Sequence, residues 1–255
     1  MATDEHATTH SRALPNLVII GAMKCGTTAL HRALGQHPQI AMSTPKELNF
    51  FFGPVHADVA SPPSWVDGNR WRGIAWYASH FPATAAVRGE ASPGYTSPNH
   101  PRVAARMADL LPHVRLVYLV RDPIARALSQ YRHHVRDGTE TRPVEEALPD
   151  PDSQYLARSR YHERLLPFLD RFPRAKLLVI AQEDLRAHPG RTLRQVVAFA
   201  GADPALVSTG ATGPSTPTMR APLNGTLQAT LAAALADDAA RLRTVIGRDL
   251  PHWNV

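Results

Sequence analysis

Residues 17–35 place the strongest constraint on what this chain can fold into. They begin with Leu17–Ile20, a short and unbroken apolar run of the kind that forms a strand buried on both faces of a parallel sheet. Gly21 and Gly26 then bracket a tight turn, and leucines at helical spacing follow. This order of strand, glycine-rich turn and helix predicts an α/β fold.

The turn has the chemistry of a phosphate-binding loop. Its glycines let the backbone approach a ligand closely, and the free N–H groups at the start of a helix point toward an anion. Lys24 adds a full positive charge, and Thr27 and Thr28 add hydroxyl donors. Taken alone, the same residues also fit an ordinary strand-turn-helix corner with a solvated lysine.

The loop differs from the nucleotide-binding Walker pattern, in which a lysine directly follows the second glycine. Here Lys24 comes two residues before Gly26, and no lysine follows that glycine directly. The sequence therefore indicates a phosphate loop of another type than the usual nucleotide loop.

A second strand-to-helix junction, at residues 115–131, carries further anion-binding groups. A buried strand breaks at Asp122-Pro123, where proline suits the first position of a helix because its missing N–H is not needed there. Arg121 ends the strand, at the edge where open α/β sheets bind ligands. Ser129 lies about two turns into the helix. An arginine fork and a hydroxyl that converge there suit a phosphate monoester, and an ion pair between Arg121 and Asp122 is the structural alternative.

Residues 45–52 join a charged pair, Lys46 and Glu47, to three consecutive phenylalanines. Such a pair is unusual unless the charges face a pocket that the aromatic rings line. A carboxylate in that pocket would be partly desolvated, which suits a general base. On physical grounds alone, a strand end with exposed charges beside core phenylalanines is the favoured interpretation.

Together these motifs resemble those of sulfotransferases that use 3′-phosphoadenosine 5′-phosphosulfate (PAPS). The run Gly-Ala-Met-Lys-Cys-Gly-Thr-Thr at 21–28 is similar to their 5′-phosphosulfate loop. The run Arg-Asp-Pro-x-x-Arg-x-x-Ser-x-Tyr at 121–131 is similar to their 3′-phosphate element, and two motifs in the expected order are far more specific than either alone. The resemblance implies a cofactor site made by Lys24, Cys25, Gly26, Thr27, Thr28, Arg121 and Ser129. Arg220, in the expected loop at 208–222, is a further candidate for this site, with solvent exposure as the favoured alternative.

The acceptor side of the site follows from the same resemblance. Glu-x-x-Phe-Phe is similar to the segment that supplies the catalytic base in heparan-sulfate-type and related bacterial sulfotransferases, which implies that Glu47 is the base. Asn49 stands where many members carry histidine. Ala91, in a Glu-x-Ser-Pro-x-Tyr segment, stands where the glycosaminoglycan enzymes often carry lysine, and this departure argues against a heparan-like acceptor. The resemblance places Asn49, Phe50 and Tyr95 next to the acceptor.

The implied reaction is an in-line transfer of a sulfuryl group to a hydroxyl or amine. Glu47 would take the proton of the acceptor, and Lys24 would neutralise charge on the departing oxygen. No metal is needed in this scheme. The acceptor class stays open between a small molecule, a lipid and a saccharide. The alternatives are a P-loop-type nucleotide-dependent kinase, which would require magnesium, and a non-catalytic nucleotide- or nucleic-acid-binding module, which would bind without turnover.

The pattern and the resemblance predict one domain over residues 15–255 after a flexible tail at 1–14. Its fold should be the P-loop-NTPase-like sulfotransferase fold, a central parallel sheet of about five strands flanked by helices. Residues 53–72 are expected to form a long surface excursion. The expected strands are 17–20, 37–42, 86–90, 115–120 and 175–181, and the expected later helices include 155–172, 189–200 and 228–246.

The charge balance favours an anionic ligand, since the formal net charge is +6 and the isoelectric point is near 9.9. The basic residues are spread along the chain, which argues against a nucleic-acid partner. The single cysteine excludes an internal disulfide, and the 13 histidines show no metal-ligand grouping. No apolar run approaches the roughly 18 residues of a membrane span. We therefore expect a cytoplasmic protein, whose oligomeric state the sequence leaves open.

Overall fold

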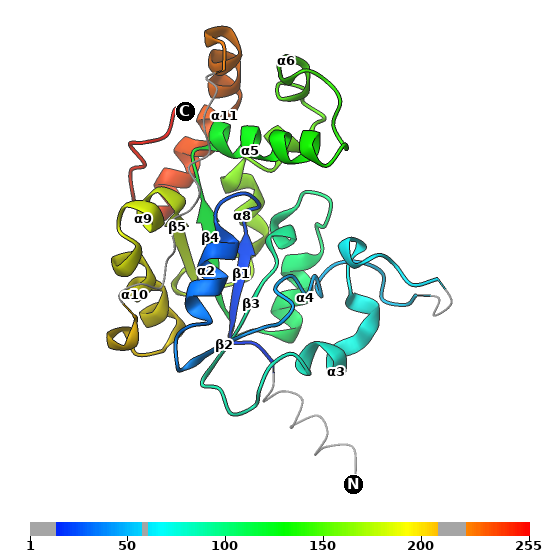
Figure 1. The fold of residues 1–255 in the computed structure, drawn as a ribbon, viewed down its shortest axis with the longest axis vertical. Helices are drawn as coiled ribbons and strands as arrows, with labels where there is room; N and C mark the ends of the chain where they lie inside the picture. The colour runs from blue at the N-terminus through cyan, green and yellow to red at the C-terminus, as the bar shows by residue number, and fades with distance from the viewer. Residues whose placement is uncertain (1–13, 58–60, 209–222) are drawn as a thin grey trace.

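A five-stranded sheet forms the centre of the computed structural model, which describes residues 14–57, 61–208 and 223–255 (Figure 1). The strand order is β2-β3-β1-β4-β5, and every neighbouring pair is parallel. The predicted α/β fold with about five parallel strands is confirmed. The strands are β1 (Leu17–Gly21), β2 (Ile40–Met42), β3 (Val87–Ala91), β4 (Arg115–Val120) and β5 (Leu177–Ala181).

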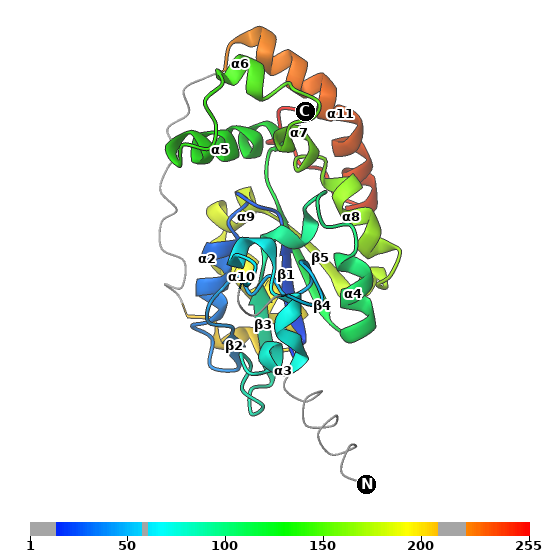
Figure 2. The same ribbon diagram turned by 90° about the vertical axis from the view of Figure 1, so that its right-hand side faces the viewer.

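Helices cover both faces of the sheet (Figure 2). On one face α2 (Thr27–Leu34) packs beside α10 (Pro189–Ala200), and on the other α4 (Val103–Leu110) packs beside α8 (Tyr161–Leu169). The strands between them are apolar without alternation because both of their faces are covered. The other α-helices are α3 (Gly73–Ala78), α5 (Pro123–Arg136), α6 (Val144–Ala147), α7 (Gln154–Ala157), α9 (Gln182–Ala187) and α11 (Gly225–Ile246), and the 3-10 helices are η1 (Trp65–Asp67), η2 (Arg70–Arg72), η3 (Pro93–Thr96), η4 (Arg174–Lys176) and η5 (Pro204–Leu206).

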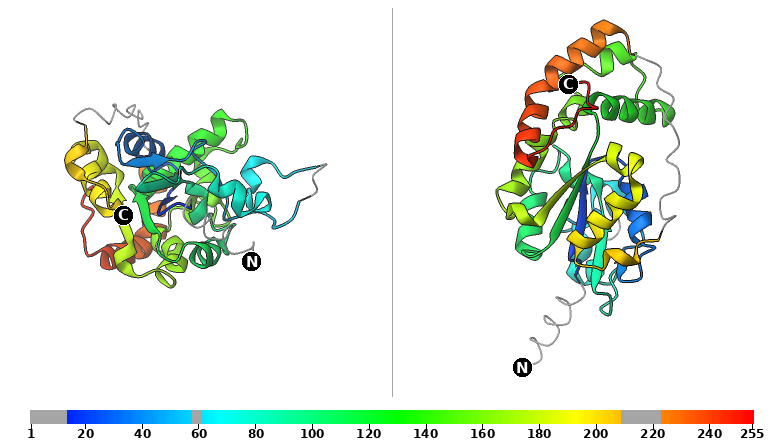
Figure 3. Two further views of the ribbon diagram at one scale, coloured as in Figure 1. Left: turned by 90° about the horizontal axis from the view of Figure 1, so that it is seen from below. Right: turned by 90° about the vertical axis from the view of Figure 1, so that its left-hand side faces the viewer.

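The carboxyl ends of the strands point toward α5, which crosses above them (Figure 1). Figure 3 shows α11 running from beside α5 down along α8. The connections that follow β1, β3 and β4 therefore meet at one edge of the sheet. The connections after β1 and β3 come close together at Gly21, where an added Cβ would stand 2.3 Å from the Thr96 hydroxyl oxygen of η3.

None of the helices in the described ranges is long and apolar enough to span a bilayer.

The helix expected over residues 155–172 is wrong in its extent, because the chain leaves the helical path between α7 and α8. Arg126 of α5 is completely buried, and its guanidinium donates to Ser159 Oγ and to the Tyr155 carbonyl oxygen, both at 2.7 Å. Ser159 in turn donates to the Pro123 carbonyl oxygen at 3.1 Å. These tertiary bonds need the turn at 158–160, which helical periodicity alone does not reveal.

The expected surface excursion at 53–72 is tied to the segment before it over its second half. Trp65 Nε1 donates to the Glu47 carbonyl oxygen at 2.6 Å, and the N–H of Asn69 donates to the Asn49 carbonyl oxygen at 3.0 Å. The N–H of Arg70 reaches the Phe52 carbonyl oxygen at 3.3 Å. Residues 65–70 thus act as a support for the segment that carries Glu47.

Candidate functional site

The loop between β1 and α2 has the backbone of an anion cradle. Lys24 and Gly26 both adopt the left-handed region, with φ of 69° and 95°. Gly26 is the N-cap of α2, and no side chain caps this helix start. The first N–H groups of a helix have no partner inside the helix, so those of α2 remain for a ligand. A Cβ at Gly26 would stand 3.0 Å from the side-chain nitrogen of Gln182, which leaves little space beside the loop.

The side chains of the loop differ in burial. Lys24 is partly buried, and burial is the main cause that lowers its pKa, with Arg136 next. The Cys25 thiol lies in the core 3.4 Å from Tyr161 Oη, and burial raises its pKa to about 11, so the thiol stays protonated. Thr27 is buried and Thr28 is exposed. The expected contact of Cys25 with a cofactor is therefore restricted to its backbone.

Arg121 brings the second predicted element to the first. Its side chain is 6% exposed, and Nη1 donates to the Lys24 carbonyl oxygen at 3.5 Å. Ser129 lies on α5 and is partly exposed. The structure thus joins Arg121 to the loop, as expected for residues at the ends of adjacent parallel strands. Arg220, the remaining predicted cofactor residue, lies outside the described residues.

Two further cations, Arg126 and Arg158, belong to the same region, because Arg126 acts electrostatically on both Lys24 and Arg158, although neither was among the predicted cofactor residues. Burial lowers the pKa of both guanidinium groups, that of Arg158 to about 10 with a further contribution from Arg126. The ion pairs among the described residues involve neither these two side chains nor Lys24 and Arg121. The signal for Arg126 was its place inside the Arg-Asp-Pro-x-x-Arg motif. The four cations make a region whose charge calls for an anion.

The start of α5 is fixed by Asp122 and by the end of the chain. Asp122 Oδ1 caps the helix by accepting from the N–H of Ala125 at 2.7 Å, and its N–H donates to Glu183 at 3.0 Å. Its second oxygen accepts from the backbone N–H and the side-chain amide of Asn254, at 2.6 and 2.8 Å. Asp122 is therefore engaged with backbone and amide groups and leaves Arg121 free of the ion pair considered as its structural alternative.

Glu47 lies on the segment that follows β2, with its side chain 45% exposed. Its carboxylate accepts from the ammonium of Lys46, and its carbonyl oxygen accepts from Trp65. The partly exposed side chain, with only Oε1 paired to Lys46, leaves the carboxylate accessible to another molecule, as a proton acceptor requires.

The three residues predicted to contact the acceptor are all buried. Asn49 is 6% exposed, Phe50 is fully covered and Tyr95 is 1% exposed. Phe50 stacks on Tyr77 with ring centroids 4.2 Å apart, and its N–H donates to Tyr95 Oη at 3.0 Å. In this structure the three side chains support the Glu47 segment from beneath, and their direct contact with an acceptor stays a prediction.

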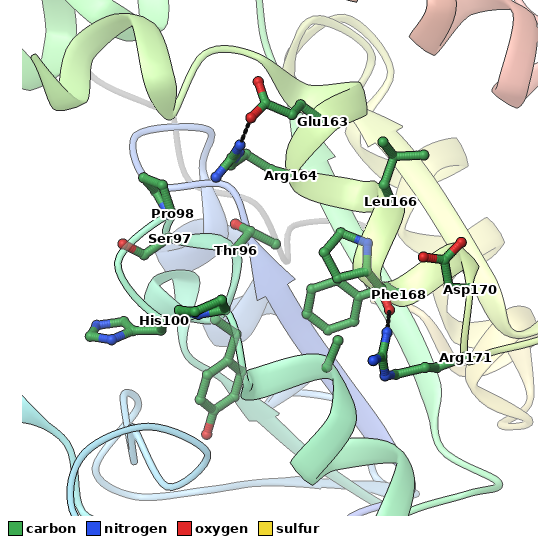
Figure 4. A pocket seen from close by; sticks show the side chains of 14 residues that line it. Thr96, Ser97, Pro98, His100, Glu163, Arg164, Leu166, Phe168, Asp170 and Arg171 are labelled. Carbon is green, nitrogen blue, oxygen red and sulfur yellow. Dashed lines mark hydrogen bonds and ion pairs between the residues drawn. The ribbon is translucent and has the colours of Figure 1, made fainter. Parts of the chain in front are cut away.

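A cavity of about 400 Å³ opens beside the same edge, between η3 with its following turn and α8 (Figure 4). Its wall joins apolar side chains, among them Leu166 and Phe168, to the ion pair of Glu163 with Arg164 (Figure 4). Tyr95 is among the residues that line this cavity. Within the described ranges, no three His, Cys, Asp or Glu side chains gather as a metal site would require.

Comparison with known proteins identifies the family and the relatives that this chain resembles. A model of the sulfotransferase family matches residues 15–205. The bifunctional heparan sulfate N-deacetylase/N-sulfotransferase 1 of Caenorhabditis elegans is 28% identical over 201 residues, which cover 72% of this chain and 22% of that protein. The chain thus spans under a quarter of the length of this curated relative.

Two solved structures share the fold over nearly the whole chain. A sulfotransferase from Alicyclobacillus acidocaldarius has a TM-score of 0.77 and 32% identity, and covers 94% of this chain and 99% of its own. The mouse sulfotransferase SULT7A1, solved in complex with PAP (3′-phosphoadenosine 5′-phosphate), has a TM-score of 0.52 at 12% identity, and covers 94% and 93%. The second likeness concerns the fold alone.

Proposed function

The chain belongs to the sulfotransferase family, and on that premise we propose that it moves a sulfuryl group from PAPS to a hydroxyl or amine of an acceptor. The observation that carries this proposal is the meeting of two separate anion-binding elements. Arg121 Nη1 lies 3.5 Å from the Lys24 carbonyl oxygen, although 97 residues separate the two along the chain. A donor that carries phosphate groups on both the 3′ and the 5′ oxygen of its ribose needs such a paired site.

On the donor side, the loop and the strand end take different phosphates. The N–H groups of Gly26, Thr27 and Thr28, together with the Lys24 ammonium, hold the 5′-phosphosulfate. Arg121 and the Ser129 hydroxyl hold the 3′-phosphate, for which a planar guanidinium fork is well suited. The unpaired cations of this region supply the charge that such a donor neutralises.

On the acceptor side, Glu47 takes the proton of the attacking hydroxyl or amine. The acceptor oxygen or nitrogen forms a bond to sulfur while the bond from sulfur to the bridging phosphate oxygen breaks, and PAP leaves. Lys24 stabilises the negative charge that develops on that bridging oxygen. The cavity of about 400 Å³ has the size of a ligand pocket, but of the predicted site residues that the structure describes only Tyr95 lines it, so the acceptor class stays open between a small molecule, a lipid and a saccharide.

The test is transfer from PAPS by the purified chain. The protein is incubated with PAPS and a panel of aliphatic alcohols, phenols, amines and saccharides in the presence of a chelator, and both PAP and sulfonated products are followed by mass spectrometry. We expect PAP to form in step with one sulfonated acceptor. Failure with every acceptor, combined with magnesium-dependent consumption of ATP, would contradict the proposal.

A further inference from the structure

Glu90, next to the end of β3, collects hydroxyl hydrogen bonds in a completely buried position. Ser92 Oγ donates to its carboxylate at 2.9 Å, and the Tyr77 hydroxyl of α3 donates to the second oxygen. Tyr95 of η3 also hydrogen-bonds this carboxylate. Three hydroxyl groups, from α3, from η3 and from the N-cap residue of η3, thus converge on one acid.

Two of these hydroxyls also form hydrogen bonds with the segment that carries Glu47. Ser92 Oγ accepts from the N–H of Asn49 at 3.1 Å, and Tyr95 Oη accepts from the N–H of Phe50 at 3.0 Å. A hydroxyl has one proton and two lone pairs. When each hydroxyl donates its hydrogen bond to Glu90, its lone pairs remain to accept from a backbone N–H group. Glu90 therefore sets the direction of both hydrogen-bond chains.

Stability does not explain a carboxylate at this place. Glu90 has no exposed surface, and no cation is among the groups that act on it, which are the hydroxyls of Tyr77, Ser92 and Tyr95. Burial raises the pKa of Glu90 to about 7, although the three hydrogen bonds oppose this. A buried acid without a cation costs stability. Its hydrogen bonds instead reach, through Ser92 and Tyr95, the N–H groups of Asn49 and Phe50, two and three residues after Glu47.

We propose that Glu90 is a positioning residue, which fixes the backbone at Asn49 and Phe50 through Ser92 and Tyr95 and thereby orients Glu47 toward the acceptor. The half-exposed Glu47 side chain itself is paired with Lys46 alone among the described residues, so its direction depends on the backbone beneath it. The orientation of Glu47 toward an acceptor rests on the proposed function, whereas the hydrogen bonding of the Asn49 and Phe50 amides does not.

Amide hydrogen exchange tests the hydrogen-bond chains without any acceptor. In Glu90→Gln the exchange of the Asn49 and Phe50 amides should speed up about 3- to 10-fold, as expected for the loss of one hydrogen bond each. Ser92→Ala should affect Asn49 alone, and Tyr95→Phe should affect Phe50 alone. Unchanged protection of both amides in a folded Glu90→Gln protein overturns the proposal, and if this variant does not fold, unchanged protection in both single hydroxyl variants does so.

A matched control is available at Asp238 of α11. Its carboxylate, whose pKa burial also raises, accepts from the backbone N–H groups of His162 and Glu163 at 3.0 and 2.9 Å. Asp238→Asn makes the same change from acid to amide at another place in the fold. It should leave the exchange of Asn49 and Phe50 as in the parent chain, and an equal acceleration there would show that Glu90→Gln acts by general destabilisation.

A double-mutant cycle tests the catalytic part. With an aliphatic alcohol as acceptor, Glu90→Gln should lower kcat about 10-fold in the parent chain, with the stabilisation by PAP unchanged. In the Glu47→Gln background it should lower kcat no further, because it acts through Glu47. An equal loss in both backgrounds would show a structural role only. A parent chain that transfers to no acceptor would refute the proposed function, while the exchange experiment would still decide on the hydrogen-bond chains.

Discussion

The donor and acceptor sides of the site differ in how their charges are balanced. On the donor side Lys24, Arg121 and Arg158 have no ion pair with a described residue, and burial lowers the pKa of Lys24 and Arg158. On the acceptor side Glu47 is paired with Lys46, and Glu90 is surrounded by hydroxyl donors. One side is incomplete without an anion, and the other is held by its own hydrogen bonds.

Under the proposed function, this difference would let one edge of the sheet serve two substrates. A region of unpaired cations gains stability when a polyanion binds, so donor binding should raise the free energy of unfolding. A segment already fixed by buried hydrogen bonds needs little ordering when the acceptor arrives, which favours the correct geometry for proton transfer. Substitutions on the two sides should therefore fail in different ways.

The largest expected effect is at Glu47, on the acceptor side. Glu47→Gln is nearly isosteric but accepts no proton, so transfer to an aliphatic alcohol should fall by about 10²- to 10⁴-fold, the usual contribution of a general base. Binding of PAP, measured by thermal shift, should not change. An acceptor that is already ionised, such as a phenolate, should lose far less. Full activity of this variant toward the alcohol would show that another group is the base.

Next in size is Lys24, on the donor side. Lys24→Ala removes one cation from the place where the leaving oxygen develops charge, and such a loss typically costs about 10²- to 10³-fold in rate. The loss should affect every acceptor alike, phenolate included, which separates it from Glu47→Gln. Steady-state rates at saturating PAPS give the measurement, and near-normal turnover would remove Lys24 from the mechanism.

A smaller effect concerns the pH dependence of stability on the acceptor side. Burial raises the pKa of Glu90 from 4.5 to about 7, which favours its neutral form in the folded chain. The stability linked to Glu90 is therefore fully present below pH 4.5 and is lost as the pH rises through 7, by about 3 kcal/mol. Urea unfolding should show Glu90→Gln gaining on the parent chain by about this amount over that range. A difference that does not vary with pH would contradict the burial of an ionising acid here.

The strand, turn and helix start of the loop at 21–28 could be predicted from the sequence because their signals are local. A strand, a glycine turn and a helix start are read from consecutive residues, and Lys24 lies where the pattern placed it. That Arg121 reaches the same loop follows from parallel strands, whose carboxyl ends share one edge. The unpaired state of Arg158 was beyond sequence analysis, because it depends on which distant side chains are missing around it.

The acceptor side was predicted less completely because it is built from distant partners. Glu47 was found through its motif, but the burial of Asn49 and Phe50 depends on Ser92 and Tyr95, which lie more than forty residues further along. Glu90 begins the Glu-x-Ser-Pro-x-Tyr segment, but the sequence gave it no role of its own, since a glutamate at a strand end usually faces solvent. Only the fold shows that three hydroxyls surround it.

The most direct test of the whole account compares nucleotides that differ in the 3′-phosphate. A charge-assisted contact from Arg121 contributes roughly 1.5–3 kcal/mol, so PAP should bind about one to two powers of ten more tightly than ADP. Thermal shift of the parent chain should rank PAP well above ADP, with or without magnesium. Arg121→Ala should erase most of this preference and Ser129→Ala a smaller part. If ADP with magnesium stabilises the parent chain as much as PAP does, the donor side is not a PAPS site and the account is wrong.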